Sequence, residues 1–334
     1  MAVTWTIILT MAGAYAITGL RRQYALAANQ LDIPNSRSSH FRPTPSSGGI
    51  GIVVAFLGGL LGLYLSNDIS STTFGIYSIG GALVAGTGLI DDFRHLSASF
   101  RLIVHYTAFG LALYAQLHGT PFQLSPLSNW FMIIGIISLL VWILNLFNFM
   151  DGIDGIACGE AIFTLLSATA ILFCLHGMNG QIFVAITLAS ACLGFLFWNW
   201  PPAKIFMGDV GSGFLGYVIG CLMLETTLTN IKFFWVWLIL LGVFIVDATL
   251  TLIRRLANFE PFFKAHCNHA YQKSARKYGS HKKVTVWVLL INLLWLFPLA
   301  VGAALKPEAG PIVTTIAYFP LVILALWLGA GKKE

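Results

Sequence analysis

The sequence predicts an all-α, polytopic integral membrane protein with about eleven transmembrane helices. Of its 334 residues, 57% are hydrophobic and only 10% are charged, whereas soluble domains carry about 25% charged residues. The apolar residues fall into windows long enough to cross a bilayer, and the basic residues collect in alternate connecting loops. This composition argues against a water-soluble enzyme, a disordered chain and a disulfide-stapled secreted domain. The five cysteines are odd in number and widely separated, so we interpret them as small buried side chains.

Each predicted span is a mostly apolar window close to the roughly 20 residues that a helix needs to cross a bilayer. In chain order the eleven windows are 3–20, 48–66, 74–90, 100–117, 130–148, 159–176, 181–199, 212–229, 233–253, 285–305 and 311–330. The first window has no basic leading segment and no small-residue cleavage site, so we predict a span there and not a signal peptide. The glycines of the second window are typical of close helix packing.

The orientation follows from the distribution of lysine and arginine, which favour the cytoplasmic side of a membrane. If residue 1 lies outside, all but two of the 19 basic residues fall on the inner side, the exceptions being Lys232 and Lys306. We therefore predict an outer N-terminus and a cytoplasmic C-terminus. The net charge of +6 then describes an inner face that lies against anionic lipid headgroups, and nucleic-acid binding is not implied.

The predicted inner loops hold almost every residue capable of chemistry. We therefore expect one transmembrane domain, 1–334, whose site is built from these loops at the cytoplasmic membrane face. The loops run approximately 21–47, 91–99, 149–158, 200–211 and 254–284.

Carboxylates cluster at the inner ends of three pairs of predicted spans. Five of the thirteen acidic residues lie there, namely Asp91, Asp92, Asp151, Asp154 and Asp209. Clustered carboxylates repel one another unless a cation neutralises them. A hard divalent cation is the economical explanation, and Mg²⁺ typically shares its coordination with waters and substrate phosphates. The cluster therefore predicts a magnesium site.

Two further features favour a phosphate substrate. Asp209 lies in Gly-Asp-Val-Gly-Ser-Gly, where we predict that a helix begins at once and offers its free N–H groups to an anion. The fifth inner loop supplies donors near the same end: Lys264, His266, His269 and Gln272. A patch that contacts lipid headgroups is the alternative for this loop, and we favour it for Lys282 and Lys283.

A polar ladder follows the fifth predicted span at a spacing of three residues: Asn145, Asn148, Asp151 and Asp154. This is the spacing of one helical face, so we expect all four side chains to point into one cavity, with Gly152 and Gly155 breaking or bending the helix. Polar groups at a membrane helix end are unfavourable unless they face a polar cavity, which favours a functional role.

Two readings stay open in the apolar spans. Asp247 lies two turns before Arg254 and Arg255 and is either a structural ion-pair partner or a site residue.

Secondary transporters also use intramembrane carboxylates and are the alternative class of function. Because transporter sites lie near the midplane on broken helices, acids at the helix ends of one side favour an enzyme.

Taken in order, the motifs resemble a known family. They are DxPNxR…PTPxxGG at 32–49, the acidic pair Asp91–Asp92, NxxNxxDGxDG at 145–155, GDxGS at 208–212 and a histidine-rich fifth inner loop at 261–272. Each motif alone is weak. Five in register with the predicted topology resemble the polyprenyl-phosphate N-acetylhexosamine-1-phosphate transferases (MraY/WecA type), over about residues 1–330.

The resemblance implies a reaction at the inner membrane of a bacterium. Undecaprenyl phosphate attacks the β-phosphorus of a UDP-N-acetyl-sugar, UMP leaves, and the sugar phosphate stays on the lipid as a diphosphate. Membrane lipids surround the enzyme, and whether the chain forms a homodimer stays open.

The resemblance also implies roles for single residues. Asp209 and Asn148 would hold Mg²⁺, or Mn²⁺ in its place, while Asp154 and Asp151 would lie near the uridine and Arg42 and His269 near the diphosphate. The residues implied in catalysis are Asp91, Asp92, Asp209 and His269. Those implied in substrate binding are Arg42, Asn145, Asp151, Asp154, Lys264, His266 and Gln272. Because a phosphate monoester has its second pKa near 6, we favour positioning of the lipid phosphate by Asp91 and Asp92 over strong base catalysis.

The chain departs from the family pattern in the fifth inner loop. The second histidine of the family's His-x-His is missing, because Tyr271 stands two residues after His269, and Cys267 stands where many relatives carry arginine. The form HAYQ, followed by a basic stretch, resembles the (WbpL-like) branch that starts O-antigen or related lipopolysaccharide chains. Which sugar is used, and which of Asp91 and Asp92 meets the lipid phosphate, stays open.

Overall fold

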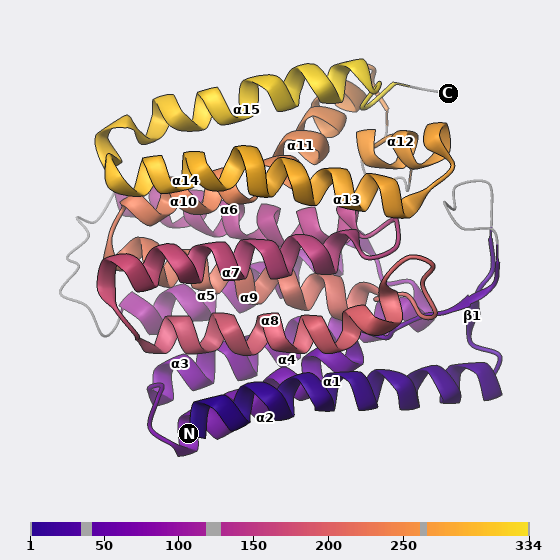
Figure 1. Cartoon of the computed structure of the whole chain (residues 1–334), viewed down its shortest axis with the longest axis horizontal. Coiled ribbons are helices and arrows are strands. Elements are labelled where there is room, and N and C mark those ends of the chain that lie inside the picture. The colour runs from indigo at the N-terminus through magenta and orange to yellow at the C-terminus, as the bar shows by residue number, and fades with distance from the viewer. Residues whose placement is uncertain (1, 35–41, 118–127, 261–265, 333–334) are drawn as a thin grey trace.

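The computed structural model describes residues 2–34, 42–117, 128–260 and 266–332. Its long helices run side by side as a bundle, with the N-terminus at one end and the C-terminus at the other (Figure 1). In chain order the elements are α1 (Ala2–Ala27), β1 (Leu31–Asp32), β2 (Thr44–Pro45), α2 (Ile50–Leu65), α3 (Ser71–Gly75), η1 (Ile76–Gly80), α4 (Gly81–Arg94), α5 (Ala98–Leu117), α6 (Ser128–Met150), α7 (Ile156–His176), α8 (Gly180–Asn199), α9 (Asp209–Thr229), α10 (Lys232–Leu240), α11 (Gly242–Ala257), α12 (Ala270–Tyr278), α13 (His281–Ile291), η2 (Asn292–Leu296), α14 (Phe297–Leu305), η3 (Pro307–Ala309) and α15 (Gly310–Trp327). The predicted all-α, polytopic membrane class is confirmed.

The structure contains fewer helices that meet the length and hydropathy of a transmembrane span than the sequence predicted. Within the described ranges, eight helices are long and apolar enough to cross a bilayer, and the bent pair α10 and α11 makes a ninth if it counts as one span. Two predicted spans are not among them: α2 has only 16 residues, and α5 carries Arg101 and His105. The number of eleven and the orientation therefore stay predictions.

Helix α9 is the centre of the bundle. Of its apolar window 89% is buried, against 17% for α1, and it packs most extensively against α6 and α4. A Cβ added at Gly216 would lie only 2.5 Å from Leu144 Cα, so glycine is what lets α6 and α9 approach this closely. The ends of α6 and α9, which carry Asn148 and Asp209, are thus placed by the best-packed part of the fold.

Helices α10 and α11 meet at a bend of 72°. Helix α11 therefore diverges from α10 and packs against α15 and α6. One contact to α6 is a hydrogen bond that Trp142 Nε1 donates to Thr249 Oγ1 at 3.2 Å. The bend matters for the site because it brings Asp247, on α11, to the start of α12.

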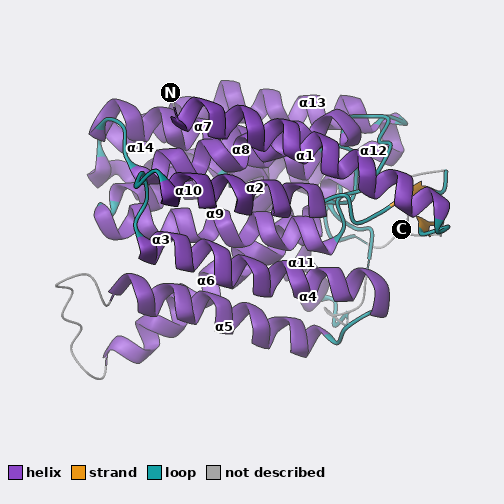
Figure 2. Ribbon diagram, turned by 90° about the horizontal axis from the view of Figure 1, so that it is seen from below, coloured by secondary structure: helices purple, strands orange, loops and turns teal. Residues whose placement is uncertain are grey.

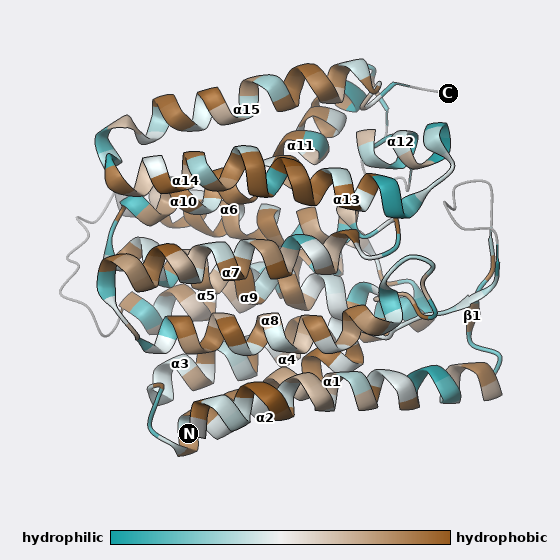
Figure 3. Ribbon diagram, viewed as in Figure 1, coloured by the Kyte–Doolittle hydropathy of each residue, from teal (hydrophilic) through white to brown (hydrophobic). Residues whose placement is uncertain are grey.

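Polar segments collect at the end of the bundle where α1 and the chain itself finish. Helix α12 and the short antiparallel pair β1–β2, in which Leu31 lies opposite Pro45, are both at this end (Figure 2). Hydrophilic residues are concentrated there, while the lengths of the helices are mostly hydrophobic (Figure 3). The predicted inner loops therefore meet at one end of the molecule.

Candidate active site

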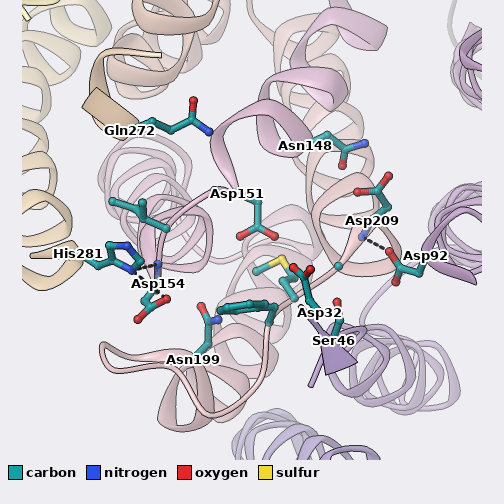
Figure 4. Close-up of a pocket in the computed structure, with 15 residues that line it drawn as sticks. Asp32, Ser46, Asp92, Asn148, Asp151, Asp154, Asn199, Asp209, Gln272 and His281 are labelled. Carbon is teal, nitrogen blue, oxygen red and sulfur yellow. Dashed lines mark hydrogen bonds and ion pairs between the residues drawn. The ribbon is translucent and has the colours of Figure 1, made fainter. Parts of the chain in front are cut away.

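Acidic and amide side chains from separate segments line one cavity of about 300 Å³ at the polar end, which we call the carboxylate cavity (Figure 4). Its polar and aromatic lining consists of Asp32, Ser46, Asp92, Asn148, Asp151, Asp154, Asn199, Phe206, Asp209, Gln272 and His281. Four of the five clustered acids predicted from the sequence therefore converge here. The fifth, Asp91, does not line this cavity.

Asp209 is the first residue of α9, and its backbone is held by α4. The N–H of Asp209 donates a hydrogen bond to Asp92 Oδ1 at 2.7 Å. The preceding Gly208 has φ 75°, and a Cβ there would lie 2.5 Å from Asp92 Oδ2, so both backbone angle and space require glycine. Asp92 Oδ2 is buried and has no hydrogen-bond partner in the described part of the protein. The GDxGS motif thus fixes the two carboxylates beside each other.

The first turn of α9 does not offer the free N–H groups that the sequence predicted. Its first N–H donates to Asp92, and the N–H groups of Gly211 and Ser212 both donate to the carbonyl of Gly208, at 3.0 and 3.1 Å. A carboxylate of this chain occupies the place predicted for a phosphate, because it satisfies the same donors.

A cation that the sequence did not single out links two of the acids. Arg101, near the start of α5, places Nη1 2.6 Å from Asp91 Oδ2 and 3.1 Å from Asp209 Oδ2. The other oxygen of Asp91 accepts a hydrogen bond from the N–H of Leu96 at 2.5 Å. Asp91 therefore acts on its surroundings through Arg101, whereas Asp92 faces the carboxylate cavity.

The polar ladder is divided by the end of α6 at Met150, so it does not lie on one helical face as predicted. Asn145 and Asn148 lie on the last turns of α6. Asp151 and Asp154 lie in the non-helical turn that precedes α7. The turn still directs Asp151 and Asp154 to the same cavity as Asn148, but Asn145 does not reach it.

Asp151 lies among other negative charges. Its pKa is raised well above the usual value, chiefly by desolvation inside the cavity and further by the negative charges of Asp209, Asp92 and Asp154. A cation or a proton would relieve this unfavourable energy.

We expect the stability of the cation-free protein to fall as the pH rises. Because the pKa of Asp151 is higher in the folded state than its unfolded value of about 4, the folded state binds this proton more tightly. Its stabilising effect is complete below that unfolded value and is lost as pH rises towards the folded pKa. Asp151→Asn should therefore flatten the dependence of the unfolding temperature on pH above the unfolded pKa of about 4, measured in detergent with a chelator. Asp68→Asn, at the other end of the bundle, should keep the wild-type slope; equal slopes in wild type and Asp151→Asn would contradict the prediction.

Asp154 connects three segments at the edge of the cavity. One of its oxygens accepts a hydrogen bond from the N–H of Ala203 at 3.0 Å, and the other lies 3.1 Å from His281 Nδ1. Its carbonyl accepts from the hydroxyl of Thr285 at 2.9 Å. Asp154 thus joins the turn before α7, the loop before α9 and the start of α13, and it places His281 in the lining.

A second cavity, of about 510 Å³, opens beside the first; we call it the lateral cavity. Its lining from α5, α6 and α11 includes apolar residues such as Leu102, Val141, Trp142, Ala248 and Leu252. Its polar end is formed by Arg101, Asn145, Asn148, Asp209, His266, His269 and Gln272. Four residues line both cavities, namely Asn148, Gly152, Asp209 and Gln272. An apolar space and a charged space therefore meet at Asp209.

His269 is buried at the start of α12 and lies in a stack of rings. Its ring centroid is 4.9 Å from that of His266, and it also stacks with Tyr271 and Phe149. Tyr271, which replaces the family's second histidine, donates its hydroxyl hydrogen to the carbonyl of Phe149 at 2.9 Å. Desolvation raises the pKa of Tyr271 well above its usual value, so the residue remains a neutral donor.

Glycine at position 152 lets α12 approach the end of α6. A Cβ added there would come within 2.9 Å of Gln272 Nε2 and even closer to the hydroxyl of Tyr271. The DGxDG motif therefore serves packing as well as the turn.

Two predicted binding residues lie away from the site or outside the described structure. Arg42 is exposed and does not line either cavity. Lys264 falls in the segment 261–265, which lies outside the described residues.

The donor set suits a magnesium ion that shares its coordination with a substrate. The described residues contain no group of three His, Cys, Asp or Glu side chains placed to hold a metal together. Mg²⁺ does not need one, since it is usually bound through one or two carboxylates, waters and substrate phosphates. The carboxylate of Asp209, the amide of Asn148 and the partnerless Asp92 Oδ2 are oxygen donors lining a cavity with excess negative charge. These residues therefore fit the predicted ion.

Several lining residues were missed in the sequence. Arg101 carried a usable signal, because a charged residue inside a predicted span is a functional candidate by default. Asp32 and Ser46 lie within the first motif but were not singled out. His281 lies in the basic stretch, Asn199 ends a predicted span, and Phe206 lies in the predicted inner loop 200–211; their local patterns carry no such signal.

Comparison with known proteins agrees with the motifs. A family model described as glycosyl transferase family 4 matches residues 74–227. A probable undecaprenyl-phosphate N-acetylglucosaminyl 1-phosphate transferase of Bacillus subtilis is 28% identical over 325 residues, covering 95% of this chain and 88% of the relative. A decaprenyl-phosphate N-acetylglucosaminephosphotransferase of Mycobacterium leprae is 30% identical over 355 residues, covering 95% and 84%. An undecaprenyl-phosphate alpha-N-acetylglucosaminyl 1-phosphate transferase of Thermotoga maritima is 28% identical over 292 residues, covering 85% and 87%.

The matches to the first two relatives extend over 95% of the chain, and the family model covers the stretch from α3 to α9 that carries Asp92, Asn148, Asp151, Asp154 and Asp209. They decide between the transferase and the transporter in favour of the transferase. The chain belongs to glycosyl transferase family 4 and is a polyprenyl-phosphate N-acetylhexosamine-1-phosphate transferase.

Proposed function

We propose that the protein transfers N-acetylglucosamine 1-phosphate from UDP-N-acetylglucosamine to undecaprenyl phosphate and releases UMP. A phosphate oxygen of the lipid attacks the β-phosphorus, and the bond from that phosphorus to the oxygen bridging to the α-phosphate breaks. The observation that carries the proposal is the meeting of a charged and an apolar cavity at Asn148, Gly152, Asp209 and Gln272. A reaction between a water-soluble nucleotide and a membrane lipid needs such a junction.

The lateral cavity suits the lipid. It runs along α6 from Ser138 to Phe149, a distance of about 16 Å at about 1.5 Å per residue. Apolar side chains line its length, and Arg101 and His269 lie at its polar end. The prenyl chain would lie among the apolar residues, with its phosphate beside the guanidinium of Arg101.

The carboxylate cavity suits the nucleotide sugar. Phe206 offers an aromatic ring on which a base can stack, and Asn199 and the His281–Asp154 pair supply polar groups near it. The diphosphate would then lie between these groups and Asp209. Arg42, Lys264 and His266 remain candidates for diphosphate contacts once substrate is bound.

Asp209 and Asn148 would hold Mg²⁺, with Mn²⁺ as a substitute, beside the diphosphate. When bound, the ion supplies positive charge that offsets the charge developing on the phosphoryl oxygens and on the leaving UMP. Asp92 fixes the start of α9 through the N–H of Asp209 and so holds the metal-binding carboxylate in place. Asp91 holds Arg101 towards Asp209. No side chain needs to act as a strong base, because the attacking phosphate is largely dianionic at pH 7.

We place the reaction on the cytoplasmic face of a bacterial inner membrane, where it would begin a lipid-linked O-antigen or related surface polysaccharide. The side of the membrane rests on the loop charges, and the pathway rests on the HAYQ form of the fifth loop. A deoxy or amino derivative of the sugar is the main competitor of N-acetylglucosamine.

The direct test uses the purified full chain in detergent with undecaprenyl phosphate, MgCl₂ and a panel of radiolabelled UDP-N-acetyl-sugars. We expect equal amounts of labelled lipid and UMP with UDP-N-acetylglucosamine, and neither product when a chelator removes the metal. Turnover of a different sugar only would correct the substrate. No product from any sugar would refute the proposed function.

The sidedness has its own test, cysteine labelling with a membrane-impermeant maleimide in whole cells. Ser70 and Lys282 are both exposed and lie at opposite ends of the bundle. In a cysteine-free background, Ser70→Cys should label in intact cells, and Lys282→Cys should label only after the cells are opened. The reverse pattern would overturn the orientation.

A further inference from the structure

Asp247 is a buried carboxylate that holds the start of α12 from a different helix. Its Oδ1 accepts a hydrogen bond from the N–H of Ala270 at 2.8 Å, and its Oδ2 accepts from the N–H of Tyr271 at 3.0 Å. Oδ1 also accepts from the hydroxyl of Thr251, one turn further along α11, at 3.2 Å. These contacts decide against an ion pair with Arg254 or Arg255. Arg254 instead donates to the carbonyl of Ala330, and Arg255 pairs with Glu260.

The same carboxylate faces the imidazole of His269. His269 Nδ1 lies 3.4 Å from Asp247 Oδ1, and both side chains are almost completely buried. The N–H of Gln272, the third residue of α12, faces the same side chain in a capping-box arrangement, and Nδ1 has hydrogen-bond geometry with neither Gln272 nor Asp247. A nitrogen lone pair pointing at a carboxylate would be repelled, whereas an N–H would be attracted. The surroundings therefore favour a proton on Nδ1.

A proton on Nδ1 decides which edge of the ring is available to a substrate. The ring cannot turn freely, because it is stacked with His266, Tyr271 and Phe149. With the Nδ1 edge taken by Asp247, the edge that His269 can present to the lateral cavity is the one carrying Nε2. The arrangement is the one found in many enzymes, in which a carboxylate accepts from one ring nitrogen of a histidine and so directs the other nitrogen to the reaction partner.

We infer that Asp247 is a positioning residue for the transfer reaction: it fixes the ring of His269 with Nδ1–H towards itself and Nε2 towards the phosphate groups. The inference rests on the proposed function for the role of His269, and it assigns Asp247 no contact with substrate.

A double-mutant cycle tests the coupling. Asp247→Asn keeps an oxygen that can cap α12 but removes the charge beside His269. We expect kcat to fall about tenfold to a hundredfold, as is common when a residue that orients a catalytic histidine or ligand is changed, with little change in KM. In a His269→Asn background, the same substitution should cause almost no further loss, because its effect passes through the missing ring. A full, additive loss in that background would mean that Asp247 only supports the fold.

Thr251→Val is the matched control. It removes a neighbouring donor to the same Asp247 oxygen and keeps the volume of the buried side chain, and it should leave kcat near the wild-type value. All variants are compared by thermal unfolding, so that a misfolded protein is not mistaken for an inactive one.

A second measurement does not need turnover. In ¹⁵N-histidine-labelled protein, the ring signals of His269 are assigned by their loss in His269→Asn. We expect Nδ1 to be the protonated nitrogen in the wild type and the proton to shift towards Nε2 in Asp247→Asn. A wild-type ring protonated only at Nε2 would refute the inference. If the protein turned over no sugar but gave the expected spectra, the proposed function would fail and the orienting role of Asp247 would stand.

Discussion

Asp209→Asn should lower kcat by about a thousandfold, the upper end of what removal of one electrostatic stabiliser costs an active site, while the protein still inserts and folds. Asp209 lies where the carboxylate and lateral cavities meet, and among the described residues it is the one carboxylate that lines both. The substitution removes one negative charge and the proposed metal ligand, but it leaves the N–H that donates to Asp92 and therefore the start of α9.

The measurement is radiolabel transfer to lipid at saturating substrates over a range of Mg²⁺ concentrations. A lost metal ligand should raise the Mg²⁺ concentration needed for half-maximal rate as well as lower the maximum. Asp68→Asn, at the opposite end of the bundle, is the control and should behave as the wild type. Wild-type turnover by a folded Asp209→Asn protein would remove Asp209 from the metal site.

The convergence of the acids could be predicted because the apolar spans restrict where the residues at their ends can lie. Once a helix must cross a bilayer, residues at its end are confined to one face, and Asp92, Asp154 and Asp209 follow from that constraint. The same reasoning predicted the all-α fold and a helix over 212–229, whose first residue in the structure is Asp209. Scarcity of charge makes such residues conspicuous in a membrane protein.

What could not be predicted depends on contacts between distant segments. A break at Gly152 was expected, but α6 already ends at Met150, and Gly152 also provides the space into which the hydroxyl of Tyr271 fits. No sequence pattern near residue 150 predicts a contact with residue 271. In the same way, the sequence left Asp247 open between a partner for the arginines two turns away and a site residue. Only the bend between α10 and α11 reveals that it faces α12.

Arg101 shows most clearly how a site residue can be missed, because its charge was taken only as evidence for the orientation in the membrane. Its charge counted towards the orientation of the membrane, and its two carboxylate partners lie 10 and 108 residues away in the chain. Whether such a residue snorkels to the lipid surface or pairs with acids depends on how α4, α5 and α9 pack. Its position between Asp91 and Asp209 makes it the best-placed cation for a phosphate in the lateral cavity.

Arg101→Ala should therefore lower kcat/KM for undecaprenyl phosphate by about a hundredfold, the loss expected when a hydrogen-bonded charge of 2–4 kcal/mol is removed from a partly buried site. Most of the loss should be a higher KM for the lipid, because the guanidinium would bind the phosphate before as well as during the reaction. The KM for the nucleotide sugar should change little.

Three comparisons make this result specific. Arg101→Lys should recover only part of the activity, since an ammonium keeps the charge but cannot bridge Asp91, Asp209 and a phosphate with a planar fork of donors. Asp91→Asn should resemble a milder form of Arg101→Ala, because it releases the guanidinium on one side only. Arg94→Ala, exposed at the end of α4, is the matched control for the loss of a positive charge near the membrane surface. If Arg94→Ala raised the KM for the lipid as much as Arg101→Ala does, the effect would come from the general surface charge, and Arg101 would have no separate role in binding the phosphate.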